Sequence, residues 1–175
     1  MQDFLSFVKD YINSQGVMYN WLDSRRFEIS PLLSSRLRFL LDGKAFIVIT
    51  DDERAWFEEY FLGLINSKSA RPLMPFFSLK GFKIDNYDNN EDLLDDVLSL
   101  TFPNGYIYIY VGKDNSKMAK LAKSKNDSLL FIFDEEYDNS FCIKSNDEHK
   151  DIKLITIAQL INACVDALIF ARVKI

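Results

Sequence analysis

Three short runs of apolar residues limit the folds that this chain can adopt. They are AFIVIT at residues 45–50, YIYIYVG at 106–112 and SLLFIF at 128–133. Short, nearly continuous apolar runs are typical of strands that are buried on both faces, as in parallel sheets. Segments with apolar residues at helical spacing separate the runs. This alternation predicts right-handed crossovers, with helices on both faces of one sheet.

Two weaker runs complete the predicted sheet. LMPFFSL at 73–79 is interrupted by Pro75, which favours a strand at the sheet edge, and SFCIK at 140–144 is short. The chain has enough apolar residues for one sizeable core. We therefore predict an α/β fold, a three-layer α-β-α sandwich with a roughly five-stranded parallel sheet, in a single domain over residues 1–175.

Apolar residues three and four positions apart mark the predicted helices. The first begins near Phe4 and ends near Gly16, where glycine suits a helix end. Ser30-Pro31 opens or redirects a second helix, and Gly43 lies where the C-terminus of that helix would favour glycine. Asp51 or Asp52 caps a third helix that follows the first buried strand.

The segment from Ile152 to Val173 is the most apolar of the chain, but polar residues interrupt it throughout. These residues are Lys153, Gln159, Asn162, Asp166 and Arg172. They argue against a membrane span. The apolar residues lie nearly all round this helix, so it must be covered on both sides, and we expect a second subunit to cover the side away from the sheet.

Charge and cysteine content restrict the partners and the compartment. The formal net charge of -5 argues against direct binding of nucleic acid, which needs a clustered Lys/Arg surface. Cys142 and Cys164 lie in apolar surroundings without CxxC spacing, which is typical of free buried thiols. Charged residues interrupt the apolar N-terminus, which argues against a signal peptide. We expect a cytoplasmic protein.

Candidate catalytic and metal-binding residues are few. His149 is the only histidine, and its surroundings, SNDEHKD, favour a solvated residue near a helix start over a base or a metal ligand. Carboxylates between Asp85 and Asp96 and from Asp134 to Glu136 could include a general acid and base, but an acidic surface also explains them. We predict no catalytic residue, no metal and no cofactor.

Two loops follow predicted strands at positions where α/β folds often bind phosphate. The first, Asp51-Asp52-Glu53-Arg54, has three carboxylates and no glycine, which predicts a helix start and not an anion site. The second carries Gly112, Lys113, Asn115 and Ser116 at the start of a helix. Backbone N–H groups, Asn115 and Ser116 could hold a phosphate there, and ordinary helix capping is the alternative.

The order of these segments resembles the sugar isomerase (SIS) fold in its phosphoheptose-isomerase-like branch. That family has a Gly-Ser-rich turn and a Ser-Gly-Asn-Ser turn that bind phosphosugar. Here Asn115-Ser116 resembles a remnant of the second turn, and Asp51-Asp52-Glu53 replaces the first. Within the branch, VITDDERAWFEEYFLGLINSKSARPLMPFFSL and LINACVDALIFARVKI are similar to the HobA family, whose counterpart elsewhere is DiaA.

This resemblance implies a non-enzymatic homotetramer that binds domain I of the replication initiator DnaA and helps it assemble at the origin. The alternatives are a phosphosugar isomerase that uses Asn115 and Ser116, or a phosphosugar-binding sensor. DALIF aligns with the end of the last DiaA helix, where a Leu-Phe pair contacts DnaA, so we place the DnaA contact at Ile169, Phe170 and Arg172. A different role for Phe170, burial between subunits, remains open.

Overall fold

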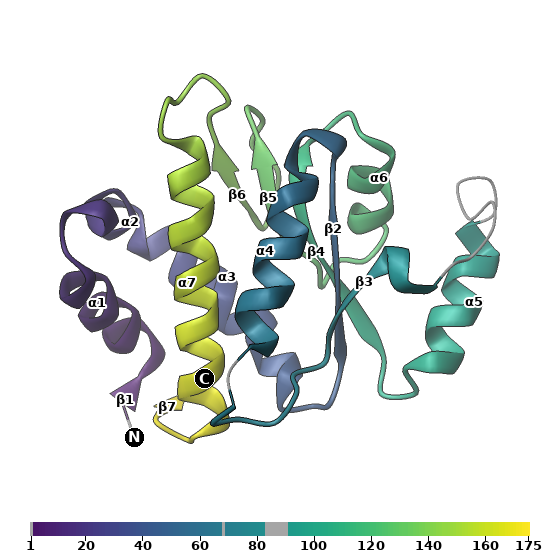
Figure 1. Ribbon diagram of the computed structural model, residues 1–175, viewed down its shortest axis with the longest axis horizontal. Helices are drawn as coiled ribbons and strands as arrows, with labels where there is room; N and C mark the ends of the chain where they lie inside the picture. The colour runs from purple at the N-terminus through teal and green to yellow at the C-terminus, as the bar shows by residue number, and fades with distance from the viewer. Residues whose placement is uncertain (1, 68, 83–90) are drawn as a thin grey trace.

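The computed structural model describes residues 2–67, 69–82 and 91–175, and it contains a parallel sheet between two helical layers (Figure 1). The five strands are β2 (Ala45–Thr50), β3 (Phe76–Ser78), β4 (Tyr106–Lys113), β5 (Leu129–Phe133) and β6 (Ser140–Ile143). Their order is β3-β2-β4-β5-β6, and every neighbouring pair is parallel. The predicted fold class is therefore confirmed, including the short edge strand that follows Pro75.

Seven α-helices and four 3-10 turns are present in the described residues. The α-helices are α1 (Phe4–Gln15), α2 (Asn20–Ser24), α3 (Arg26–Leu37), α4 (Ala55–Asn66), α5 (Glu91–Thr101), α6 (Lys117–Lys123) and α7 (Lys150–Ile169). The 3-10 turns are η1 (Val17–Tyr19), η2 (Arg38–Leu40), η3 (Asp52–Arg54) and η4 (Leu79–Phe82). The predicted end of the first helix at Gly16 is confirmed, since its φ of 85° is a conformation that glycine adopts readily.

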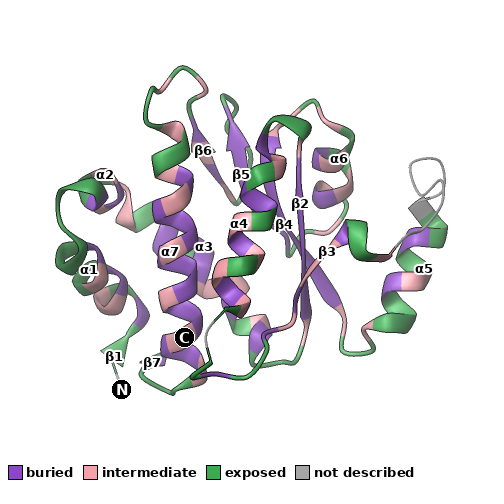
Figure 2. Ribbon diagram, in the orientation of Figure 1, coloured by how far each residue is buried: buried purple, intermediate pink, exposed green. Residues whose placement is uncertain are grey.

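The two faces of the sheet bury different cores, because successive side chains of a strand point to opposite faces. On one face, Phe46, Val48 and Ile109 pack with buried residues of α1, α3, α4 and α7. On the other face, Ile47 and Tyr108 pack with α5 and α6. All six residues of β2 are buried, which explains why its sequence has no polar alternation (Figure 2).

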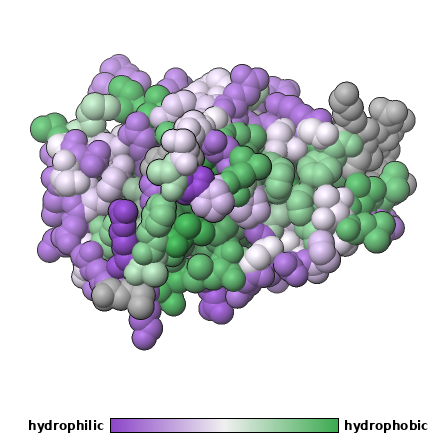
Figure 3. Space-filling view, turned by 60° about the horizontal axis from the view of Figure 1, so that its bottom comes forward, coloured by the Kyte–Doolittle hydropathy of each residue, from purple (hydrophilic) through white to green (hydrophobic). Residues whose placement is uncertain are grey.

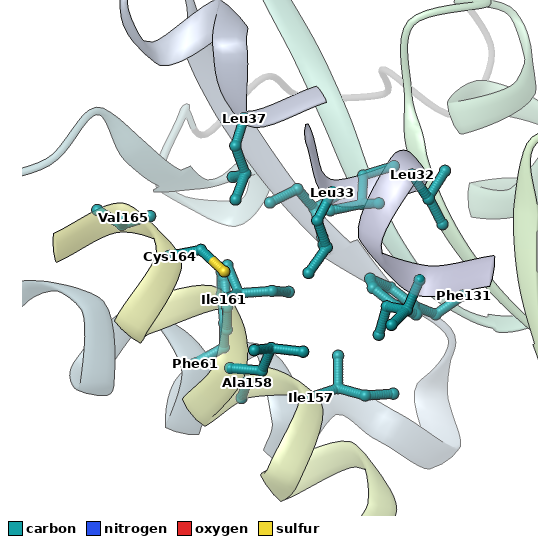
Figure 4. Packing of buried hydrophobic residues seen from close by; sticks show 14 of the residues in the cluster. Leu32, Leu33, Leu37, Phe61, Phe131, Ile157, Ala158, Ile161, Cys164 and Val165 are labelled. Carbon is teal, nitrogen blue, oxygen red and sulfur yellow. The ribbon is translucent and has the colours of Figure 1, made fainter. Parts of the chain in front are cut away.

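Helix α7 is covered by its own chain, so the expectation that a second subunit covers it is wrong. Ile157, Ile161 and Val165 are fully buried, and Ile157 and Ile161 point toward the α3 side chains such as Leu33 (Figure 4). Helix α1 and helix α4 also pack against α7. The N-terminal segment is attached by polar bonds as well, because Trp21 Nε1 donates to Thr156 Oγ1 at 3.2 Å.

Length and composition alone would allow α7 to cross a membrane, but 61% of its most apolar stretch is buried inside the protein. It is therefore the core helix of the fold, in agreement with the prediction that this segment does not span a membrane. Cys164 of this helix is a free, buried cysteine, as predicted. Burial raises the pKa of its thiol. Cys142 is also free and is half-buried on β6.

The second helix does not begin at Ser30-Pro31, so the first of the two roles predicted for this pair, a helix start, is wrong. Helix α3 begins at Arg26, and Pro31 lies inside it. Ile29, Leu33 and Leu37 are four residues apart and fully buried, so the helix continues through the proline to keep all three in the core. Burial of such side chains, worth about 1.5–3 kcal/mol each, outweighs the cost of about 3 kcal/mol for an internal proline.

Candidate functional site

The first candidate site is the end of the sheet where neighbouring crossovers diverge. The chain crosses from β2 to β3 on one side and then to β4 on the other, so the carboxyl ends of β2 and β4 form the switch point of the sheet. Ligands of open α/β sheets bind in the crevice at this point. The two loops that the sequence singled out, after Thr50 and around Lys113, meet here, since Thr50 pairs with Val111 in the sheet register.

The carboxylate of Asp51 occupies the position where an anion would bind. Its Oδ1 accepts a hydrogen bond from Arg54 N at 3.1 Å, and its Oδ2 accepts from Arg54 Nη1 at 2.6 Å and from Lys113 N at 2.8 Å. The Arg54 side chain is only 5% exposed and lies over the Phe133 ring at 4.0 Å. Glu53 extends the network at the surface, where Lys113 Nζ and Arg54 Nη1 each approach it at 3.0 Å.

Gly112 is required by this arrangement because the Asp51 carboxylate approaches its backbone closely. A Cβ atom at position 112 would lie 2.8 Å from Asp51 Cγ and 2.3 Å from the Tyr110 hydroxyl. Gly112 belongs to β4 and does not form part of a flexible loop. The glycine that suggested a phosphate loop in the sequence therefore accommodates an internal carboxylate.

Ser116 caps a helix, which is the alternative that the sequence left open. Its Oγ accepts from Ala119 N at 2.9 Å and shares a 2.6 Å hydrogen bond with the Tyr110 hydroxyl. Burial raises the pKa of Tyr110 to about 12, so this hydroxyl stays neutral at neutral pH. Asn115 is exposed beside it in the turn. The donors that a phosphate would need at this loop are largely used within the protein.

Other candidate residues of the sequence take structural positions. His149 is exposed at the residue that precedes α7, as expected for a solvated residue near a helix start. In the described ranges, no group of three or more His, Cys, Asp or Glu side chains could hold a metal ion. The acidic positions 83–90, which include Asp85 and Asp88, lie outside the described residues.

The second candidate site is the C-terminal end of α7, where the sequence placed a partner contact. Phe170 follows the last helical residue and is 45% exposed, while Ile169 is partly buried against the core. The Arg172 side chain lies over the Phe170 ring, with 5.4 Å from Cζ to the ring centroid. The three predicted residues therefore lie together, but only Phe170 and Arg172 offer a large accessible surface.

The backbone beyond α7 is fixed by contacts that the sequence analysis missed. Ala171 adopts a φ of 52°, and Arg172 N donates to Ala167 O at 2.8 Å, which ends the helix. Strand β7 (Val173–Lys174) then pairs in parallel with β1 (Gln2–Asp3). Two-residue strands have too little pattern to be detected in a sequence. Their pairing holds the chain end against α1 and presents Phe170 at a defined position.

A third feature is an apolar groove between η1 and the start of α7. It has a volume of about 350 Å³ and is lined by Val17, Met18, Trp21, His149, Ile152 and Lys153. Val17 is 84% exposed and Met18 is 59% exposed. The sequence analysis missed this groove, because its lining joins residues more than a hundred positions apart.

Comparison with known proteins gives one consistent family. The model of the family described as "HobA: DNA replication regulator" matches residues 1–175. The DNA replication regulator protein HobA of Helicobacter pylori is 24% identical over 182 residues, which cover 100% of both chains.

Two solved structures are similar over the whole chain. A crystal structure of H. pylori HobA has a TM-score of 0.77 and 25% identity, with 100% of this chain and 99% of that chain covered. The HobA chain in a HobA–DnaA (domain I-II) complex from H. pylori has a TM-score of 0.78 and 24% identity, with 100% of both chains covered. The fold is therefore that of the HobA crystal structures.

The Asp51 network predicts a stability difference between two adjacent acidic residues. Asp51→Ala removes the cap of η3, the 3-10 turn that leads into α4, and leaves the buried Arg54 guanidinium without its main partner, so the free energy of unfolding should fall by about 3 kcal/mol. For a domain of this size the melting temperature should drop by roughly 6–12 °C. Calorimetric melting of the variant and the wild-type protein measures this difference.

Asp52→Ala is the matched control, because it removes one carboxylate from the same turn at an exposed position. We expect its effect to stay within about 0.5 kcal/mol. Equal melting temperatures for the Asp51 and Asp52 variants would contradict the buried role of Asp51.

Proposed function

Because this chain belongs to the HobA family of DNA replication regulators, we propose that it is a non-enzymatic adaptor for the initiator DnaA. In this proposal it binds the N-terminal domain of DnaA, domain I, and promotes assembly of DnaA at the chromosomal origin. The relative from H. pylori has been crystallised with domains I-II of DnaA, which supports this partner. The cytoplasm is the compartment in which it would act.

One observation carries the contact site that we propose, namely the exposed aromatic side chain at the end of α7. Phe170 combines a large apolar ring with a neighbouring cation, Arg172, and aromatic and arginine side chains are enriched among residues that dominate binding energy. Ile169 precedes Phe170 in the chain and is partly buried against the core. We propose that these three residues contact DnaA.

The closed crevice supports a non-enzymatic role over the alternative of a phosphosugar isomerase or phosphosugar-binding protein. A phosphosugar would have to displace the Asp51 carboxylate from Arg54 and from the Lys113 backbone amide. Glu53 also pairs with Lys113 and Arg54, the two cations that a phosphate would need at this position. Its negative charge opposes the approach of a phosphate.

Assembly into a homotetramer is part of the proposal, with residues 1–175 acting as one SIS-like domain in each subunit. An uncovered face of the last helix does not explain an oligomer, because α7 is covered by its own chain. The groove at Val17, Met18 and Ile152 is the apolar surface that we propose for contacts between subunits. We do not expect direct binding of nucleic acid, in keeping with the net charge of -5.

Phe170→Ala tests the proposed contact. An exposed anchor should lose about 2 kcal/mol or more of binding free energy, or roughly 30-fold in Kd for DnaA domain I, while the melting temperature stays unchanged. Titration calorimetry with purified domain I measures the affinity, and light scattering checks the assembly.

Phe27→Ala serves as the control for this experiment. Phe27 is 65% exposed on α3 and has Arg26 stacked on its ring, so it matches Phe170 in type and environment. It should bind domain I as the wild-type protein does. Unchanged binding by a correctly assembled Phe170→Ala variant would exclude the end of α7 as the contact.

A phosphosugar titration separates the adaptor from its enzymatic alternative. Since the crevice donors already bind Asp51, addition of a phosphosugar at millimolar concentration should release no heat of binding. Calorimetry of the wild-type protein measures this directly. A clear binding isotherm would favour the isomerase or sensor instead.

The assembly prediction is tested by light scattering at micromolar concentration. A homotetramer should have about four times the mass of the 20.4 kDa chain, and Met18→Asp should lower this mass by placing a charge in the apolar groove. Leu100→Asp, at a leucine that is 85% exposed on α5, should leave the mass unchanged. A single-chain mass for the wild-type protein would contradict the proposal.

A further inference from the structure

The loop between α4 and β3 contains a buried arginine, although charged side chains of surface loops are ordinarily exposed to solvent. The Arg71 side chain is only 1% exposed. Its Nη1 donates to Asp166 Oδ1 at 2.5 Å, and its Nη2 donates to Asn162 Oδ1 at 2.7 Å and to the Ile65 carbonyl oxygen. The guanidinium therefore binds the last turn of α4 and the last two turns of α7 at once.

A second bond holds the loop close to β3. The Asn66 side chain accepts a hydrogen bond from Met74 N at 2.9 Å, and Met74 itself is 4% exposed in the core. Between these two buried attachments, Leu73 is 75% exposed. A leucine that points into solvent from a firmly attached backbone loses little conformational freedom when it binds a partner.

Leu73 and Phe170 emerge at the same end of the protein. Asp166, which binds Arg71, lies one helical turn before Phe170 on α7, and the loop runs past the end of α7 beside β7 (Figure 1). Figure 3 turns this end toward the viewer and shows hydrophobic side chains gathered on it. The two exposed side chains thus belong to one end of the molecule, which we call the C-terminal face.

We propose that Leu73 is a second anchor of the DnaA contact, and that Arg71 is a positioning residue that holds it beside Phe170. This inference rests on the proposed function, because it extends the contact site assigned there. It adds a loop almost a hundred positions away in sequence to a site otherwise made of residues at the end of α7. Two anchors from separate elements define the orientation of a partner better than one helix end does.

Charge on the C-terminal face indicates what the partner surface carries. Arg172 and Lys174 are exposed there, and neither forms an ion pair within the described part of the chain. Of the acidic residues at this end, Asp166 is bound by Arg71, and Asp3, opposite Lys174 in the β1–β7 register, accepts a hydrogen bond from Ser6 N. The face therefore suits an apolar groove of DnaA domain I that is bordered by carboxylates.

Binding of purified DnaA domain I to Leu73 variants tests this inference. Leu73→Ala should raise Kd at least about tenfold, and Leu73→Asp should raise it more than Leu73→Lys does, because of repulsion from the acidic border. Leu100→Ala is the control, since Leu100 is 85% exposed on α5, which packs on the opposite face of the sheet from α7. Its Kd should equal that of the wild-type protein.

The outcomes separate the inference from the function on which it rests. If the wild-type protein binds domain I and Leu73→Ala binds within twofold of it, the second anchor is overturned while the adaptor function stands. A Leu73→Ala variant that loses assembly together with binding also overturns it, because Leu73 would then contact another subunit. If the wild-type protein binds no domain I, the proposed function fails and the inference fails with it.

Discussion

The burial of α7 by other parts of its own chain is the contact on which the rest of the structure depends. Ile157, Ile161 and Val165 connect the sheet-side core to α3, and polar bonds such as Trp21 to Thr156 attach the N-terminal helices to the same helix. Arg71 adds the α4–β3 loop to it. With its sides covered in this way, α7 can offer a partner only its ends. The surfaces of α7 that a partner can reach are therefore Phe170 at one end and the groove beside Ile152 at the other.

At the switch point, the carboxylate of Asp51 takes the position where α/β folds of this kind usually bind an anion. Three donors converge on the Asp51 carboxylate, and two of them, backbone amides, are of the kind that would bind a phosphate. A carboxylate fixed by the chain itself requires no ligand and adds a buried ion pair with Arg54. Gly112 is needed for its close approach. The architecture persists while its usual chemistry is blocked, so function must be argued from other surfaces.

Local patterns in the sequence predicted those parts of the fold that local physics determines. The apolar runs at 45–50 and 106–112 identified central strands, and Gly16 identified a helix end. Pro31 misled because burial of Ile29 and Leu33 overrides the preference of proline for a helix start.

Long-range partners could not be read in the same way. The apolar residues all round α7 predict that the helix is covered on every side, but they do not indicate whether its own chain or another subunit covers it. The capping role of Asp51 was visible in the sequence, whereas its bond to Lys113 N, 62 positions away, was not. The sequence did not indicate a role for Arg71 or Leu73 either. A charged residue that is buried and a leucine that is exposed, both in one short loop, follow no pattern of helix or strand.

The edges of the sheet complete this account of where a partner can bind. At β6, Arg25 Nη1 donates to the Cys142 carbonyl oxygen at 2.6 Å, and its guanidinium lies 3.8 Å from the centre of the Phe141 ring. Glu28 holds the same guanidinium in place. The bond from Arg25 occupies one backbone acceptor of β6, which makes this edge a poorer template for a strand from another protein. The donors at the switch point are also occupied by Asp51. The described surface therefore favours recognition of a partner by exposed side chains at helix ends and in one loop. Such side chains can be substituted without changing the fold.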